Sequence, residues 1–243
     1  MKVLSIGNSF SEDASRYLHG VAKADGTNMK VVNLYIGGCP LSVHYTNMLE
    51  NSKSYALQFN GEPTGFCVSI KEAILSEAWG GWDVITLQQV SNLAPNYDTY
   101  QPYLNSLADY IHKYAPKAKL FMHQTWSYEK DSARLCDELG YKKPEEMLAD
   151  LESAYAAAAA DINAAGIIPC GEVFGELSKE GMKVHRDTYH ANLGLGRYAL
   201  ALTWYKKLTG KDIIGNSFCD FDETVDPETA LKVQKIVDGT LNK

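Results

Sequence analysis

The 243-residue sequence has no long apolar run and no long run of basic residues. A membrane-spanning helix needs about 20 consecutive apolar residues, and even the alanine-rich stretch 154–160 is short and flanked by polar residues. With 23 basic and 30 acidic residues the net charge is −7, so the concentrated positive face that nucleic acid requires is not expected. These absences exclude a membrane span and argue against nucleic acid as a partner.

The sequence also lacks the cysteine patterns of a disulfide framework or a zinc site. Its five cysteines are odd in number, and none forms a C-x-x-C pair. Scattered, reduced thiols are typical of a cytosolic protein, and no basic segment followed by a long apolar one precedes the first predicted strand. We therefore expect a cytoplasmic protein without a bound metal.

The glycine spacing of dinucleotide-binding proteins is missing as well. The turn after the first predicted strand holds Gly7 alone, without the G-x-G-x-x-G pattern. Nucleotide or flavin binding is therefore unsupported, and we expect no cofactor. A small molecule is the partner that remains, and the sequence leaves the oligomeric state open.

What the sequence does contain is a regular alternation of short apolar strands with amphipathic helices. The length suits one domain, residues 1–243, and five segments are of strand type: 3–6, 29–36, 84–87, 118–122 and 166–169. This alternation predicts an α/β fold with three α/β/α layers and a flavodoxin-like, doubly wound, five-stranded parallel sheet in the order 2-1-3-4-5. Residues 53–66 are expected to form an excursion with an Asn60-Gly61 hairpin turn, and the sequence does not decide whether it forms a lid or an interface.

Polar residues and glycine follow the predicted strands at their carboxyl ends, where open α/β sheets bind ligands. In chain order these residues are Ser9, Gly38, Gln88, Asn92, His123 and Trp126. A later polar loop would bring Asp187 and His190 to the same edge if it packs there. This edge of the sheet is therefore the predicted site.

Ser9, His190 and Asp187 are the residue types that acyl transfer requires. A serine hydroxyl is too weakly acidic to attack at neutral pH unless a base takes its proton, and histidine is the natural base. Asp187 lies three residues before His190 and could hold the imidazole in one tautomer. Nearby N–H groups would stabilise the oxyanion that forms during acyl transfer.

Simpler interpretations of the same residues stay open at this point. The sequence 7–9 could be a turn with a helix cap, and Asp187 could be a local cap for the loop that holds His190. Cys39 could be a nucleophile in place of Ser9, although Pro40 follows it directly and no helix start would lower its pKa.

Four blocks in the right order carry a resemblance to a known family. GNSFS at 7–11, Gly38, LQQVSN at 87–92 and DTYH at 187–190 resemble the four blocks of the SGNH (GDSL-like) hydrolase superfamily. The resemblance spans nearly the whole chain, and it is greatest to a bacterial branch that opens with G-N-S-F-S. It implies a three-layer α/β/α domain and metal-free ester hydrolysis through an acyl-enzyme.

Matching the motifs one by one, the resemblance assigns Ser9 as the nucleophile, His190 as the base and Asp187 as the residue that orients it. The same matching makes the backbone N–H groups of Ser9 and Gly38 oxyanion donors. It therefore implies an SGNH-type serine hydrolase with a complete Ser-His-Asp triad.

The third block departs from the usual G-x-N-D pattern and leaves one oxyanion donor open. Counted from Asp83, Asn92 falls where the family's asparagine would. The stretch also resembles the Q-G-E-S-N sequence of acetylesterase relatives, which would make Gln88 the donor, and we favour Gln88 slightly. The first block departs too, because Asn8 replaces an aspartate and Phe10 an aliphatic residue.

The resemblance implies a serine esterase that hydrolyses small acyl esters, acetyl groups on carbohydrate above all, because related branches are carbohydrate acetylesterases. The 15 tyrosines and 4 tryptophans suit stacking on sugars, and Trp126, Tyr189 and His123 are the expected substrate contacts. The alternative is a ligand- or partner-binding protein with the same fold and little catalysis.

Overall fold

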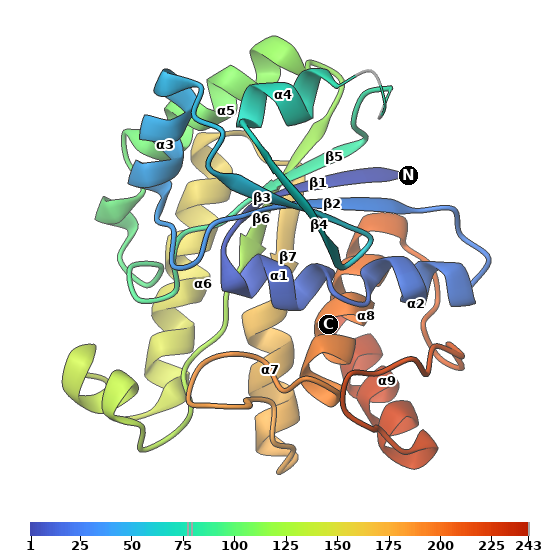
Figure 1. The fold of residues 1–243 in the computed structure, drawn as a ribbon. Coiled ribbons are helices and arrows are strands. Elements are labelled where there is room, and N and C mark those ends of the chain that lie inside the picture. The colour runs from blue at the N-terminus through green and yellow to red at the C-terminus, as the bar shows by residue number, and fades with distance from the viewer. Residues whose placement is uncertain (77, 79, 243) are drawn as a thin grey trace.

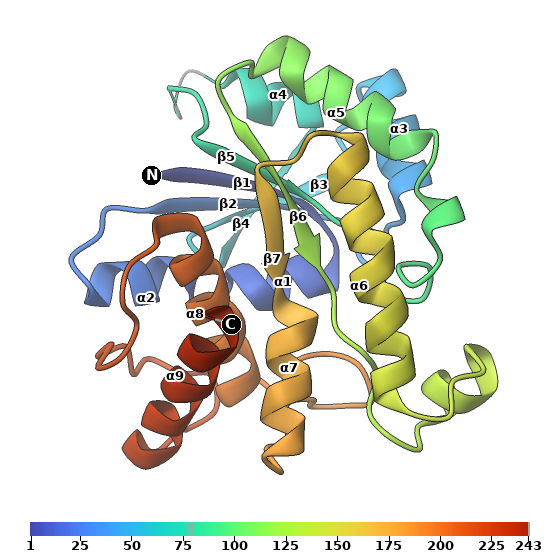
Figure 2. The same ribbon diagram turned by 180° about the vertical axis from the view of Figure 1, so that it is seen from behind.

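The computed structural model describes residues 1–76, 78 and 80–242. In this part of the chain a central sheet lies between two layers of helices (Figure 1 and Figure 2). In chain order the strands and α-helices are β1 Lys2–Gly7, α1 Ser9–Ser15, α2 Leu18–Ala24, β2 Lys30–Tyr35, α3 Leu41–Glu50, β3 Tyr55–Phe59, β4 Glu62–Val68, α4 Ile70–Leu75, β5 Val84–Leu87, α5 Tyr103–Tyr114, β6 Lys119–Gln124, α6 Pro144–Asp161, β7 Gly166–Pro169, α7 Cys170–Lys179, α8 Leu195–Thr209 and α9 Pro227–Leu241.

The sheet has the strand order β4-β3-β2-β1-β5-β6-β7, and the five strands β2, β1, β5, β6 and β7 run parallel. β1 is central, since Val3 pairs with Val31 of β2 on one side and with Val84 of β5 on the other. Strands covered on both faces are mainly apolar, and this explains the composition of β1 and β5, whose buried polar residues Ser5 and Thr86 hydrogen-bond to each other at 3.0 Å. The carboxyl ends of these parallel strands meet at one edge of the sheet.

The predicted five-stranded sheet with the order 2-1-3-4-5 was wrong in strand number, because a hairpin extends the sheet to seven strands. β3 and β4 are antiparallel, and β3 pairs antiparallel with β2. They are joined at Asn60 and Gly61, whose φ angles of 52° and 87° are those of a tight hairpin turn. Residues 53–66 are thus mostly part of the sheet and do not form a separate lid.

Helices cover both faces of the sheet (Figure 1 and Figure 2). The helices α3, α4 and α5 lie together on one face, and α1, α2, α8 and α9 lie on the other. α8 packs against α1, α2, α7 and α9, and nine of its residues are buried. Among the described residues, no helix is both long and apolar enough to cross a membrane.

Candidate active site

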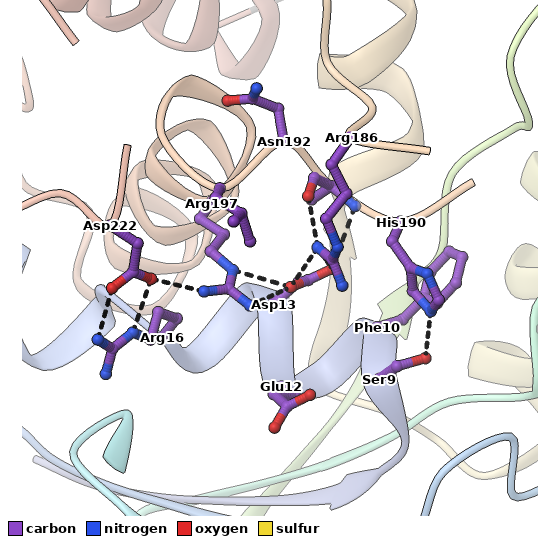
Figure 3. A network of polar contacts seen from close by, with 12 residues as sticks. Ser9, Phe10, Glu12, Asp13, Arg16, Arg186, His190, Asn192, Arg197 and Asp222 are labelled. Atoms are coloured by element: carbon purple, nitrogen blue, oxygen red, sulfur yellow. Dashed lines mark hydrogen bonds and ion pairs between the residues drawn. The ribbon is translucent and has the colours of Figure 1, made fainter. Parts of the chain in front are cut away.

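Ser9 and His190 are hydrogen-bonded to each other at the carboxyl end of β1. Ser9 is the first residue of α1, and the side chain of Asn8 caps this helix by accepting a hydrogen bond of 3.1 Å from the Phe10 N–H. His190 Nε2 lies 3.0 Å from Ser9 Oγ (Figure 3). The close turn requires Gly7, since a Cβ there would lie 2.5 Å from Ser11 Oγ.

Asp187 holds the imidazole of His190 from the opposite side. Its Oδ2 lies 2.8 Å from His190 Nδ1, and its Oδ1 accepts hydrogen bonds from the backbone N–H groups of Tyr189 and His190. Partial burial raises the pKa of Asp187, but these hydrogen bonds outweigh it and lower the pKa to about 2. The ionised carboxylate can only accept, so Nδ1 carries the proton and Nε2 is free to accept from the Ser9 hydroxyl.

The loop that carries Asp187 and His190 is fastened to α1 by a buried carboxylate, Asp13. Asp13 is fully buried and accepts hydrogen bonds from Arg186 at 2.8 and 2.9 Å, from Arg197 at 2.9 Å and from the Ala191 N–H at 3.1 Å (Figure 3). Arg197 also pairs with Asp222. The helix that begins at Ser9 and the loop that ends at His190 are thus held together by charge-assisted hydrogen bonds.

Gln88 does not face the site, contrary to our slight preference for it as an oxyanion donor. Its side chain is 1% exposed, and its amide nitrogen donates to Asn8 Oδ1 at 2.9 Å. Its amide oxygen lies 2.8 Å from His123 Nδ1. Both ends of the amide are therefore occupied behind Ser9, where Gln88 supports the helix cap.

His123 and Trp126 were wrongly predicted to contact substrate, because both are completely buried. The ring of Phe10 lies over Trp126, with centroids 4.1 Å apart, and separates it from the site. The Trp126 indole N–H donates to the Tyr189 carbonyl at 2.8 Å, so it supports the loop that holds Asp187 and His190. Burial lowers the pKa of His123 to about 3, which keeps its imidazole neutral.

Ser9 and His190 open onto a cavity of about 430 Å³. Its described lining residues are Asn8, Ser9, Phe10, Tyr35, Gly37, Gly38, Val90, Ser91, Asn92, Tyr128, Arg134, Tyr189 and His190. The predicted residues Gly38, Asn92 and Tyr189 are thus brought to the site. Gly38 has a φ of 62°, a conformation that glycine adopts readily, and none of the hydrogen bonds found among the described residues uses its N–H.

The sequence analysis missed Arg134 and Tyr128, which line the cavity from the segment between β6 and α6. Arg134 begins a short π-helix, Arg134–Glu138, and its guanidinium lies above the ring of Tyr189. This segment has no strand end or apolar periodicity from which the sequence could have placed it. Tyr128 follows β6 by four residues, and its hydroxyl lies 2.8 Å from Ser91 Oγ.

Cys39 is poorly placed to act as a nucleophile. It is 2% exposed, and burial raises the pKa of its thiol to about 12. Its sulfur lies 3.5 Å from Nδ1 of His44, which belongs to α3 and not to the loop that holds His190. Among the described residues, no cluster of histidine, cysteine and carboxylate side chains has the arrangement of a metal site.

Comparison with known proteins gives one family and one fold. The model of the family DUF4886, a domain of unknown function, matches residues 2–235. A DUF4886 family protein of Bacteroides uniformis is 33% identical and superposes with a TM-score of 0.90, over 100% of this chain and 95% of that one. No curated protein matches.

Two further solved structures share the fold at lower identity. A candidate SGNH hydrolase of Slackia heliotrinireducens is 21% identical, with a TM-score of 0.61 over 86% of this chain and 98% of that one. A candidate GDSL-like lipase of Parabacteroides merdae is 16% identical, with a TM-score of 0.57 over 86% and 95%. The chain therefore has the fold of proteins described as SGNH hydrolases.

Proposed function

Since the chain belongs to the DUF4886 family and has the fold of proteins described as SGNH hydrolases, we propose that it is a serine esterase. One observation carries this proposal. Ser9 Oγ, His190 and Asp187 form an unbroken hydrogen-bonded series, with distances of 3.0 and 2.8 Å, and Ser9 faces a cavity. A serine that merely capped a helix would need no histidine and no carboxylate behind it.

The proposed reaction proceeds through an acyl-enzyme. Ser9 Oγ attacks the ester carbonyl carbon while His190 Nε2 takes the hydroxyl proton, and Asp187 stabilises the imidazolium that results. The imidazolium then gives this proton to the departing alcohol. In the second half, His190 takes a proton from water, the hydroxide attacks the acyl carbon, and Ser9 recovers its hydroxyl hydrogen.

The oxyanion would accept hydrogen bonds from the backbone N–H groups of Ser9 and Gly38. Asn92 is the third donor that we assign, because it is exposed and lines the cavity, whereas the amide of Gln88 is buried and occupied. Removal of one such donor typically lowers kcat about 10²- to 10³-fold, so Asn92→Ala should do so while Ser9 remains reactive.

A small acyl group on a carbohydrate is the substrate class that we assign. The cavity of about 430 Å³ suits a small ligand, and the partly exposed aromatic rings of Tyr35 and Tyr189 along it offer surface against which a sugar could stack. Acetyl esters should therefore be hydrolysed faster than esters of long acyl chains, as a series of p-nitrophenyl esters would reveal.

The test compares wild type with Ser9→Ala, His190→Ala and Ser106→Ala. Ser106 lies on α5 with its hydroxyl on the Pro102 carbonyl, so its variant controls for loss of a serine elsewhere. With p-nitrophenyl acetate and acetylated xylose, the first two variants should lose at least about 10³-fold in kcat. A fluorophosphonate probe should label wild type and Ser106→Ala but not Ser9→Ala. Turnover that survives Ser9→Ala would overturn the proposal.

A further inference from the structure

Arg134 differs from every other arginine of this chain. The sequence contains four, and the other three are Arg16, Arg186 and Arg197, which bind the carboxylates of Asp13, Asp222 and Glu62. The guanidinium of Arg134 forms no ion pair or hydrogen bond with any of the described residues; its contact is with an aromatic face. Its guanidinium carbon lies 4.1 Å from the centre of the Tyr189 ring.

The surroundings of Arg134 make its lack of a carboxylate partner informative. It is half-buried, and it is the sole permanently charged side chain among the described residues that line the catalytic cavity. A cation that is partly withdrawn from water without a partner carries a desolvation cost, which a bound anion would offset. The whole protein has a net charge of −7, so general attraction of anions does not explain a cation here.

The stacking on Tyr189 also places Arg134 within reach of a substrate at Ser9. The Tyr189 ring centre lies 3.9 Å from that of His190, and His190 lies 3.0 Å from the Ser9 hydroxyl. Stacking fixes the guanidinium plane and leaves the N–H groups along its edge able to bind an oxyanion with two parallel hydrogen bonds. The cation and Ser9 thus line the same cavity, with the rings of Tyr189 and His190 between them.

Building on the proposed esterase function, we propose that Arg134 binds a carboxylate on the substrate, so that the enzyme acts on esters whose acyl or alcohol part carries a negative charge. One arginine supplies one positive charge, which matches a carboxylate better than a doubly charged phosphate. An acetylated sugar acid is one substrate of this kind.

A matched series of acetyl esters tests the charge preference directly. The substrates are 3- and 4-acetoxybenzoate, the neutral 3- and 4-acetoxybenzamides, and 4-acetoxyphenyl phosphate. Wild type should favour at least one benzoate over its benzamide by about 10-fold or more in kcat/KM. A hydrogen bond to a charged group is typically worth about 10- to 100-fold, so Arg134→Gln should abolish this ratio by lowering benzoate turnover by that factor.

Two controls separate the effect of this one guanidinium from general effects of charge and folding. Lys130→Gln removes the same charge from an exposed residue that lines a different cavity, and it should leave the ratio unchanged. Lys130→Gln should hydrolyse the benzamides within about threefold of wild type, whereas Arg134→Gln should lose more turnover on the benzoates than on the benzamides. Equal losses on benzoate and benzamide, or a ratio that survives in Arg134→Gln, would overturn the assignment. A stronger Arg134-dependent preference for the phosphate would overturn the choice of carboxylate.

A binding measurement keeps this inference separate from the esterase proposal. Calorimetric titration with 4-hydroxybenzoate and 4-hydroxybenzamide requires no turnover, and wild type should bind the carboxylate at least about 10-fold more tightly. Binding that depends on Arg134 without any ester hydrolysis would refute the esterase and keep the carboxylate site. If hydrolysis depends on Ser9 but neither assay shows a preference that depends on Arg134, the carboxylate site is refuted and the esterase proposal is kept.

Discussion

Replacing Asp13 with asparagine should destabilise the protein markedly, because two arginines would lose their buried counter-charge. Asp13 is fully buried, and the side chains of Arg186 and Arg197 that it binds are 26% and 12% exposed. Breaking a buried ion pair by removing one partner costs about 3–5 kcal/mol. Arg197 keeps Asp222 and Arg186 keeps the Ala191 carbonyl at 2.5 Å, so we expect the lower figure, about 3 kcal/mol.

This loss can be measured as a free energy and as a temperature. A change of 1 kcal/mol shifts Tm by about 2–4 °C in a protein of this size, so Asp13→Asn should lower Tm by about 6–12 °C. Urea unfolding gives the free energy independently. Glu62→Gln is the control, because Glu62 pairs with Arg16 but is 65% exposed, and its loss should cost no more than about 1 kcal/mol.

The same substitution should lower kcat more than it raises KM. Asp13 holds the Ala191 N–H, and Ala191 directly follows His190, so the imidazole would be placed less accurately against Ser9. Small misplacements of a reacting group are costly, and we expect a loss on the order of 10-fold in kcat with p-nitrophenyl acetate. If the free energy of unfolding of Asp13→Asn lies within about 1 kcal/mol of the wild-type value, Asp13 does not hold this loop against α1.

Two further predictions concern titrating groups away from Ser9. Hydrogen bonds from Arg16 above all hold the pKa of Asp222 far below its usual range. The ionised Asp222 therefore stabilises the folded protein at neutral pH, and this contribution is lost as the pH falls below about 4. The difference between Tm at pH 7 and Tm at pH 3 should be smaller for Asp222→Asn than for wild type. An equal fall of Tm in both proteins would contradict this. Burial raises the pKa of the Cys39 thiol to about 12, so iodoacetamide at pH 8 should alkylate exposed Cys67 and Cys219 first, as peptide mass spectrometry would show. Early labelling of Cys39 in the folded protein would show that its thiol is accessible.

The sequence was most informative where a buried strand ends. The carboxyl ends of parallel strands share one edge of the sheet, so the ends of β1, β2 and β5 could be placed together without knowledge of any contact. Ser9, Gly38 and Asn92 do line one cavity. Asp187 and His190 lie three residues apart, so their contact with each other is local and their spacing alone suggests it.

The sequence did not indicate which side chains at that edge of the sheet are buried in the core and which reach the cavity. His123 and Trp126 follow a strand as Ser9 does, but Phe10 covers Trp126, and α8 brings Trp204 within 4.9 Å of the His123 ring. Burial of this kind depends on packing between elements far apart in the chain. Strand ends therefore predicted which edge held the site, but not which side chains reach the cavity.

Contacts between residues far apart in the sequence could not be predicted from it either. Asp13 and Arg186 are separated by 173 positions, and nothing in their local patterns pairs them. Arg134 lies in a segment without regular periodicity, so neither a strand rule nor a helix rule places it. The sequence also suggested the 53–66 hairpin but not that it would pair with β2, because edge pairing leaves little trace in a short strand.

The cap at the start of α1 restricts how this site could have diverged from its relatives. Asn8 Oδ1 accepts from Gln88 and from the Phe10 N–H, while Asn8 Nδ2 donates to the Cys39 carbonyl at 3.1 Å. An aspartate, which the SGNH pattern that this chain resembles has in its first block, would set a carboxylate oxygen against that carbonyl with no proton between them. Exchange of asparagine for aspartate would therefore place two acceptors against each other beside Gly38.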